Sequence, residues 1–206
     1  MKKLAVLSQK GGAGKTTLAL HIAVAAELDG SSTAIVDLDP QASASDWGDS
    51  REDESPAVVS GQAARLDHIL KVANGAGADL IIIDTAPHSE NASLQAARVA
   101  DFVLIPCRPA ILDLRAIGHT VDIVKLANKP ASIVLNAVPP QGSIAYEAAR
   151  AIKSYEVDLA PINLVQRVAY QHSLTAGLTA QEYEPSGKAA NEIRRLYDWV
   201  KGKVGM

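Results

Sequence analysis

A glycine-rich run, Lys10–Thr17, is the part of this sequence that most directly implies chemistry. It follows a short apolar stretch and precedes a stretch rich in Ala and Leu, so a strand, a loop and a helix are predicted in that order. Glycines let main-chain N–H groups turn around phosphate oxygens, and the N-terminus of the following helix attracts the same anion. The run therefore predicts a phosphate-binding loop formed by Gly11, Gly12, Ala13, Gly14, Lys15, Thr16 and Thr17.

Three residues of this loop could each contact a different part of a nucleoside triphosphate with its Mg²⁺. The ammonium of Lys15 can reach the β- and γ-phosphates, and the hydroxyl of Thr16 can ligate Mg²⁺. Thr17 is placed to touch the α-phosphate. A glycine-rich turn without a ligand is the competing interpretation, but the Gly-Lys-Thr triplet and its strand–loop–helix context favour the phosphate loop.

Three carboxylates end predicted strands and could serve the same site. Asp37 and Asp39 follow the second strand, and Asp84 follows the apolar residues Ile81–Ile83. In open α/β sheets, ligands bind beyond the carboxyl ends of the strands, so these side chains are expected near the loop. Asp84 can hold Mg²⁺ directly or through water, with Asp37 close to the ion and to Thr16. An Asp at a strand end can instead cap a turn, and that alternative stays open for each residue taken alone.

Short β-branched runs alternate with helical patterns along the chain. Several runs are apolar throughout, which is typical of strands buried on both faces of a parallel sheet. This order predicts an α/β fold, a mostly parallel twisted sheet with helices on both faces. Strands are predicted at Leu4–Ser8, Thr33–Asp37, Asp79–Asp84, Phe102–Pro106 and Ser132–Asn136, and helices at Lys15–Leu28, Ala63–Ala73, Leu114–Ala127, Ser143–Tyr155 and Gly187–Val204.

Composition limits the classes of protein that fit. The 206 residues are enough to bury a core without disulfides, and the single cysteine, Cys107, excludes an internal one. The net charge of −3 gives no global argument for nucleic acid. The stretch Asp46–Ser60 is the most polar and irregular, and Asp49–Pro56 within it is expected to be an exposed loop. It is too short for a domain linker, so residues 1–206 are expected to form one domain. No apolar run reaches the length of a membrane span.

The phosphate loop departs from the ordinary pattern in a way that indicates a family. Position 9 is Gln9 rather than Gly, and Lys10 follows it, so Lys10-Gly11-Gly12-x-Gly14-Lys15-Thr16 resembles the deviant Walker A motif of the ParA/MinD family. Three more segments are similar to family motifs in the same order: Asp37–Gln41, Ile81–Pro87 and Leu104–Asp113. The resemblance covers nearly all of the chain. It is greatest to small ParA proteins such as ParF, which lack an N-terminal helix-turn-helix extension.

The resemblance implies a Mg-dependent ATPase that forms a nucleotide-sandwich homodimer with ATP. Lys10 would reach the partner subunit's ATP and neutralise charge that develops there, like an arginine finger supplied in trans. Asp39 would orient the attacking water. The implied catalytic residues are therefore Lys10, Lys15, Asp39 and Asp84. For Lys10 taken alone, a solvated surface charge is the competing interpretation.

Later strand ends supply candidates for contacts with adenine. The resemblance implies that Asn136, at the end of a predicted strand, lies against the base, and a turn-forming Asn explains the same residue equally well. Pro161 and Asn163 follow the last strand and could flank the base.

Basic residues gather near the C-terminus, and Arg167, Lys188, Arg194 and Arg195 are the candidates for contact with DNA. Apolar residues recur at helical spacing among them, so an amphipathic helix packed on the sheet explains the pattern without a ligand. A DNA-facing surface, continuous across two paired subunits, would need only phosphate contacts. A membrane-surface helix like that of MinD is the third interpretation, and the acidic residues on the polar side argue against it.

Three functions compete. The favoured hypothesis is a ParA-like partition or positioning ATPase, cytoplasmic and nucleoid-associated, whose ATP-bound dimer binds DNA non-specifically. A centromere-binding or cargo adaptor protein would stimulate hydrolysis and release. The alternatives are a MinD-like membrane-associated ATPase and a biosynthetic amidase-type ATPase such as the cobyrinate synthases, although no glutaminase domain is evident in the sequence.

Overall fold

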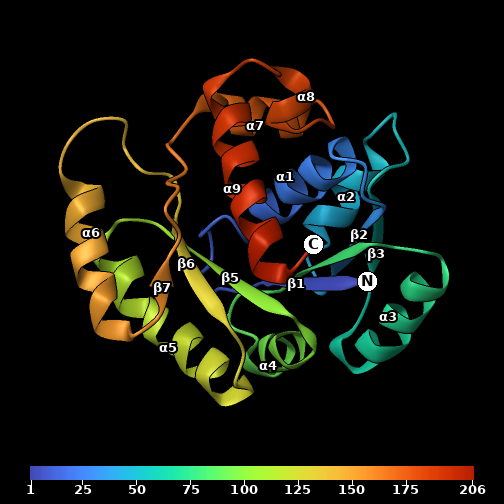
Figure 1. The fold of residues 1–206 in the computed structure, drawn as a ribbon, viewed down its shortest axis with the longest axis horizontal. Coiled ribbons are helices and arrows are strands. Elements are labelled where there is room, and N and C mark those ends of the chain that lie inside the picture. Colours follow the sequence, from blue (N-terminus) through green and yellow to red (C-terminus); the bar gives the residue numbers. More distant parts are fainter.

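The computed structural model describes residues 1–206, and its centre is one sheet of seven parallel strands. The strand order is β3-β2-β4-β1-β5-β6-β7, so β1 lies in the middle of the sheet (Figure 1). Parallel neighbours need crossover connections, which the helices provide. The α/β fold expected from the sequence is confirmed. The strands are β1 (Lys2–Val6), β2 (Thr33–Asp37), β3 (Ala57–Ser60), β4 (Leu80–Asp84), β5 (Phe102–Cys107), β6 (Ala131–Leu135) and β7 (Asp158–Leu159).

Helices cover both faces of this sheet. One group, with α1 and α9 at its centre, lies on one face, and α3 to α6 lie on the other (Figure 1). The helices are α1 (Lys15–Leu28), α2 (Ser43–Asp49), α3 (Leu66–Gly75), α4 (Glu90–Val99), α5 (Ile111–Ala127), α6 (Ile144–Ile152), α7 (Val168–Thr175), α8 (Ala180–Tyr183) and α9 (Lys188–Val204), with 3-10 turns η1 (Ala63–Arg65) and η2 (Lys153–Tyr155).

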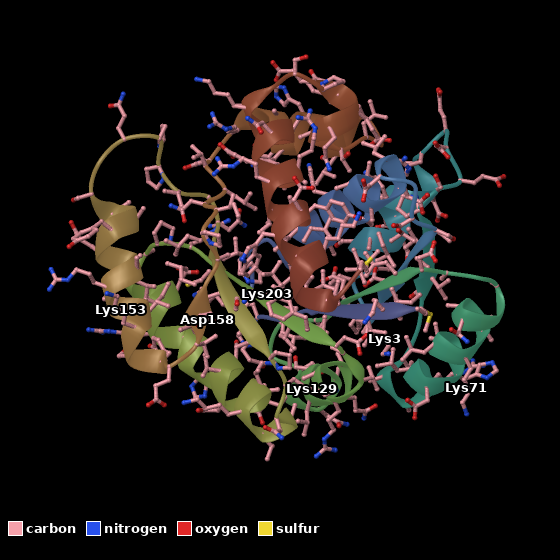
Figure 2. All side chains as sticks on the ribbon, viewed as in Figure 1. Lys3, Lys71, Lys129, Lys153, Asp158 and Lys203 are labelled. Carbon is pink, nitrogen blue, oxygen red and sulfur yellow. The ribbon has the colours of Figure 1, made fainter.

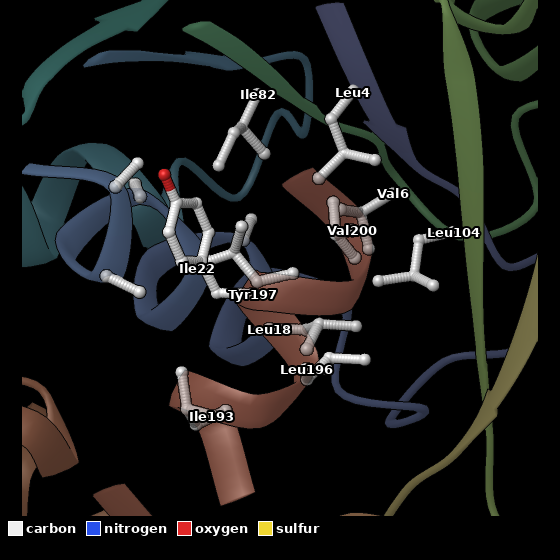
Figure 3. Packing of buried hydrophobic residues seen from close by; sticks show 14 of the residues in the cluster. Leu4, Val6, Leu18, Ile22, Ile82, Leu104, Ile193, Leu196, Tyr197 and Val200 are labelled. Carbon is white, nitrogen blue, oxygen red and sulfur yellow. The ribbon is translucent and has the colours of Figure 1, made fainter. Parts of the chain in front are cut away.

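Alternate residues of the central strands feed two separate cores. Leu4 and Val6 of β1 pack with Ile82 of β4 on the α1/α9 side, as Figure 3 shows. Ile81 and Ile83 point to the opposite face, where they meet α3 to α6. The two cores contain 26 and 24 buried residues, so neither face of the sheet is left open. This two-sided burial explains why the strands read as continuous apolar runs.

Helix α9 closes the first core. Its apolar side, which includes Ile193, Leu196 and Val200, is buried against α1 and the sheet (Figure 3). Near its end, Nζ of Lys203 lies 3.9 Å from Oδ2 of Asp158 in β7, and Figure 2 labels both residues. The amphipathic-helix interpretation is confirmed, and the apolar side is not available to a lipid surface. No helix has both the length and the apolar character needed to cross a bilayer.

The exposed loop predicted at Asp49–Pro56 lies between the end of α2 and the start of β3, and Glu52, Asp53 and Glu54 are exposed. The wider stretch Asp46–Ser60 is less irregular than expected, because it begins inside α2 and ends with β3, which is the edge strand of the sheet. Side chains of an edge strand face solvent, and Ala57, Val59 and Ser60 are exposed, so β3 lacks the apolar run that marks the central strands. Helices α4, α7 and α8 were not predicted either. The buried residues of α4 are alanines and a serine, which leave no clear apolar pattern, and α7 and α8 have only 8 and 4 residues.

A charged cluster joins α2 to α8. The guanidinium of Arg51, whose side chain is 3% exposed, donates to both carboxylate oxygens of Glu182 at 2.8 and 3.2 Å and lies over the Trp47 ring. Glu182 also accepts the N–H of Thr179 at 2.7 Å, which completes the capping box of α8. Burial raises the pKa of Glu182, but the contacts with Arg51 and Thr179 outweigh it, so the pKa lies below its usual value.

We expect Glu182→Ala to destabilise the fold. The substitution leaves the Arg51 guanidinium buried and unpaired, so the free energy of unfolding should fall by about 3 kcal/mol. Glu156→Ala is the matched control, because Glu156 pairs with Lys125 while 81% exposed, and it should cost less than about 1 kcal/mol. Urea unfolding followed by circular dichroism measures both. Equal and small losses in the two variants would contradict a stabilising role for the cluster.

Candidate nucleotide-binding site

The phosphate loop has a backbone that requires glycine. Gly12 and Gly14 have φ values of 73° and 92°, in the left-handed region, and Gly14 is the N-cap of α1. A Cβ atom on Gly14 would lie 2.2 Å from Nδ2 of Asn136. That amide donates a 2.8 Å hydrogen bond to the carbonyl of Ala13, so Asn136 supports the loop from β6. The loop therefore opens onto the N-terminus of α1, where main-chain N–H groups favour an anion.

Gln9 fixes the entrance to the loop, a role that the sequence did not reveal. Its N–H donates to Oγ1 of Thr120 at 3.0 Å, and its side-chain amide donates to Oγ of Ser93 at 2.9 Å. Its carbonyl accepts the N–H of His88 at 3.3 Å. The unusual residue at position 9 thus joins the loop to α4, α5 and the segment after β4. The one sign of this role in the sequence was that position 9 is Gln9 where the ordinary phosphate-loop motif has Gly.

Asp84 is a buried carboxylate beside the loop. Register pairs it with Val6 of β1 on one side and with Asp37 of β2 on the other, all at carboxyl strand ends. The residue is fully buried, and neither carboxylate oxygen has a hydrogen-bond partner. The pKa of Asp84 is raised to about 7: burial raises it most, the charges of Asp37 and Asp39 also raise it, and the nearby Thr16 hydroxyl and Lys15 ammonium offset part of the rise. A buried carboxylate of this kind favours a bound cation.

Lys15 faces this acidic group. Its side chain is buried, and burial lowers the pKa of its ammonium while the charges of Asp84 and Asp39 raise it. The predicted Lys15, Asp39 and Asp84 therefore lie within electrostatic reach of one another. Lys10, by contrast, is half-buried at the start of the loop and forms no ion pair within the chain.

Asp37 and Asp39 shape the loop that follows β2. Asp37 is fully buried, and its oxygens accept three backbone N–H groups: Asp39 at 3.0 Å, Ala44 at 3.0 Å and Ser45 at 3.2 Å. One oxygen of Asp39 accepts the N–H of Gln41 at 2.9 Å. The capping role weighed for these residues is therefore present, and a contact of Asp37 with Mg²⁺ stays a prediction.

The residues around Asp84 fit Mg²⁺ better than a metal held by protein alone. No three His, Cys, Asp or Glu side chains form a metal-binding group. Mg²⁺ usually takes one or two carboxylates together with substrate phosphates and water. Asp84 and Thr16 would supply the protein ligands, and the orphaned oxygens of Asp84 are the observation in favour.

A cavity of about 350 Å³ adjoins the loop on the side of Gly14 and Thr17. Asn136 lines it, together with the segment Leu164–Arg167 and Tyr170 of α7. The predicted Pro161 and Asn163 do not line it. The strand β7 is only two residues long, but the chain continues beside β6, where the N–H of Leu164 donates to the carbonyl of Leu135 at 2.9 Å. Val165 then forms a bridge with Val138, beyond the end of β6, and the residues that line the cavity begin at Leu164.

The four candidate DNA residues differ in exposure and in what they contact. Lys188 and Arg195 are exposed on α9, and Arg194 donates to the carbonyl of Pro185. Arg167 instead lines the cavity, and its guanidinium pairs with Glu192 at 2.5 Å. We therefore remove Arg167 from the DNA candidates, because its charge is already matched within the chain.

Comparisons with known proteins agree with this site. A family model described as the CobQ/CobB/MinD/ParA nucleotide binding domain matches residues 4–179. The carboxysome distribution maintenance protein A of Halothiobacillus neapolitanus is 28% identical and aligns over 96% of this chain and 95% of its own length.

Solved structures show the same fold. McdA of Cyanothece, an aspartate-to-alanine variant in complex with ATP, superposes with a TM-score of 0.76 at 17% identity, over 100% of this chain and 97% of that one. MinD of Pyrococcus horikoshii with Mg-ADP gives 0.79 at 18% identity, over 97% and 95%. The phosphate loop, the buried carboxylate and the family match over most of the sequence lead to one conclusion: the chain belongs to the CobQ/CobB/MinD/ParA family of nucleotide-binding domains.

Proposed function

We propose that this chain is a Mg-dependent ATPase that positions a cargo through an ATP-bound homodimer. The observation that carries the ATPase assignment is Asp84, a fully buried carboxylate with two unpartnered oxygens beside a glycine loop at a helix N-terminus. The positioning role rests on the family and on the resemblance to proteins such as the carboxysome distribution protein.

The residues around the loop would share the work of phosphoryl transfer to water. Lys15 and the N–H groups at the start of α1 would neutralise the phosphates, and Asp84 with Thr16 would hold the Mg²⁺, which offsets negative charge on the β- and γ-phosphates. Asp39, which is half-buried and electrostatically coupled to Lys15, would orient the water that attacks the γ-phosphorus. The bond between the γ-phosphorus and the bridging oxygen breaks, so ADP and inorganic phosphate are the products, and the proton of the attacking water passes to the phosphate or to solvent.

Lys10 supports the dimer part of the proposal. Its ammonium has no acidic partner inside the chain, although it is half-buried next to the loop. A second subunit that faces the loop would bring its own triphosphate close to this cation. ATP would then favour the dimer by linkage, because it binds the paired state more tightly.

The DNA part of the proposal rests on α9. Lys188 and Arg195 are exposed and lie seven residues apart, so they share one side of the helix. Two such sides in a dimer would give a basic surface for phosphate contacts. A cargo adaptor that stimulates hydrolysis would release the dimer from DNA.

Asp84→Asn should stabilise the nucleotide-free protein at pH 8. The folded-state pKa of Asp84 is about 7 and the ordinary value is 3.8, so the stability of the wild type falls as pH rises between these values. The variant avoids that loss and should gain about 4 kcal/mol at pH 8, with the gain vanishing near about pH 4. Thermal unfolding in EDTA across this range measures the effect. Parallel pH profiles of the two proteins would refute a raised pKa of Asp84 in the folded state.

Lys10→Ala should separate binding from turnover. ATP affinity should stay within about threefold of the wild type, and the stimulated hydrolysis rate should fall at least tenfold, because an in-trans cation acts on the transition state. Lys71→Ala, an exposed lysine on α3, is the control and should keep both values. Unchanged turnover in Lys10→Ala would rule out the trans-acting role.

Binding to random-sequence DNA should require ATP and weaken with salt. We expect retention with ATP and little with ADP, and Asp39→Ala should remain DNA-bound because it hydrolyses poorly. Lys188→Ala and Arg195→Ala should each reduce the slope of log affinity against log salt by about one per subunit. Lys153→Ala, exposed at the end of α6, is the control. DNA binding that does not depend on the nucleotide, or the absence of DNA binding, would contradict the DNA proposal.

A further inference from the structure

A single carboxylate on α9 organises one wall of the cavity beside the phosphate loop. Glu192 accepts hydrogen bonds from Nε and Nη2 of Arg167 at 2.9 and 2.5 Å, from the hydroxyl of Tyr170 at 3.1 Å and from the N–H of Val165 at 3.1 Å. These contacts occupy both of its oxygens. Glu192 is thus bonded to three residues of one chain segment, and it belongs to a different element.

Arg167 and Tyr170 face the cavity that Gly14 and Thr17 of the phosphate loop also line. The nucleotide phosphates belong at the loop, so the cavity next to it is the space left for the nucleoside. The Tyr170 ring also packs edge-on against the buried His21 of α1, with centroids 5.2 Å apart. The wall therefore contacts both α1 and α9.

The backbone of this segment is held next to β6 up to Gln166. The N–H of Leu164 donates to the carbonyl of Leu135 at 2.9 Å, and the N–H of Gln166 donates to the carbonyl of Val138 at 2.8 Å. Helix α9 is anchored by buried residues on either side of Glu192, including Ala189 and Ile193. Glu192 therefore joins two fixed elements, and a carboxylate placed in this way can hold long side chains in one orientation.

The charges within this group are matched. The side chains of Arg167 and Glu192 are 25% and 13% exposed, and the pair keeps the guanidinium charged: hydrogen bonding to Glu192 raises the pKa of Arg167. Burial and the Glu192 charge raise the pKa of the Tyr170 hydroxyl. Tyr170 therefore stays a neutral donor to Glu192 at any pH the protein meets.

We propose that Glu192 is a positioning residue that holds the guanidinium of Arg167 and the ring of Tyr170 as the wall for the nucleoside part of a bound purine nucleotide. This inference rests on the proposed nucleotide site. A planar guanidinium stacks on flat rings, and one that is already fixed by a carboxylate loses less freedom when it does so. Arg167 thus contributes to nucleotide affinity, and Glu192 acts through it.

The test compares a ligand that has a nucleoside with one that lacks it. Calorimetry would give the Kd of Mg·ADP and of Mg·pyrophosphate for the wild type, for Glu192→Ala and for Asp198→Asn. Asp198 is exposed on the same helix without a hydrogen-bond or ion-pair partner, so its variant is the control. We expect Glu192→Ala to weaken Mg·ADP about tenfold and to leave Mg·pyrophosphate within about twofold, and the control to change neither.

Arg167→Lys keeps the charge but not the planar fork, so it tests the same wall without unbalancing the pair. It should weaken Mg·ADP about fivefold and leave Mg·pyrophosphate unchanged, which keeps the proposal testable if Glu192→Ala fails to fold. Equal weakening of both ligands, or unchanged Mg·ADP binding in both variants, would overturn the role of Glu192. Failure of the wild type to bind either ligand would instead overturn the nucleotide site itself.

Discussion

The site depends on one electrostatic imbalance, a carboxylate buried at the end of a central strand whose charge the neighbouring Lys15 offsets only in part. Asp84 lies at the end of β4, paired in register with Asp37, and its two oxygens have no partner. Burying this charge in an apolar core costs free energy, and the raised pKa of Asp84 reflects that cost. A bound Mg²⁺ and triphosphate would convert the same group from a destabilising element into part of a binding site.

The parallel direction of the strands explains why the Asp84 carboxylate lies beside the phosphate loop. Because β1, β4 and β2 run in the same direction, Val6, Asp84 and Asp37 end at one edge, and the phosphate loop leaves β1 at that edge. Hydrogen bonds from Gln9 and Asn136 then fix both ends of the loop to distant elements. Asp37 organises the neighbouring loop through three backbone N–H groups. Movement in any of these segments would therefore displace the groups that would contact bound phosphates.

The sequence predicted the central sheet and the phosphate loop because both leave strong local patterns. Ile81–Ile83 can only suit a doubly buried strand, and Gly14 marks a left-handed backbone that no other residue fits at that contact with Asn136. The edge strand β3 was missed because three of its four residues are exposed and it lacks an apolar run. Gln9, Glu192 and the cavity-facing position of Arg167 could not be read from the sequence, since each depends on contacts between residues more than twenty positions apart.

The central claim is that Asp84 and the phosphate loop form one Mg·nucleotide site. Isothermal titration of ATP, with Mg²⁺ and with EDTA, into the wild type and into Gly14→Ala tests it most directly. We predict binding that Mg²⁺ strengthens at least tenfold in the wild type, a gain of about 1.4 kcal/mol or more, and none in Gly14→Ala, whose Cβ would meet Asn136. ATP binding by the wild type that is absent, or that is the same with Mg²⁺ and with EDTA, would contradict it.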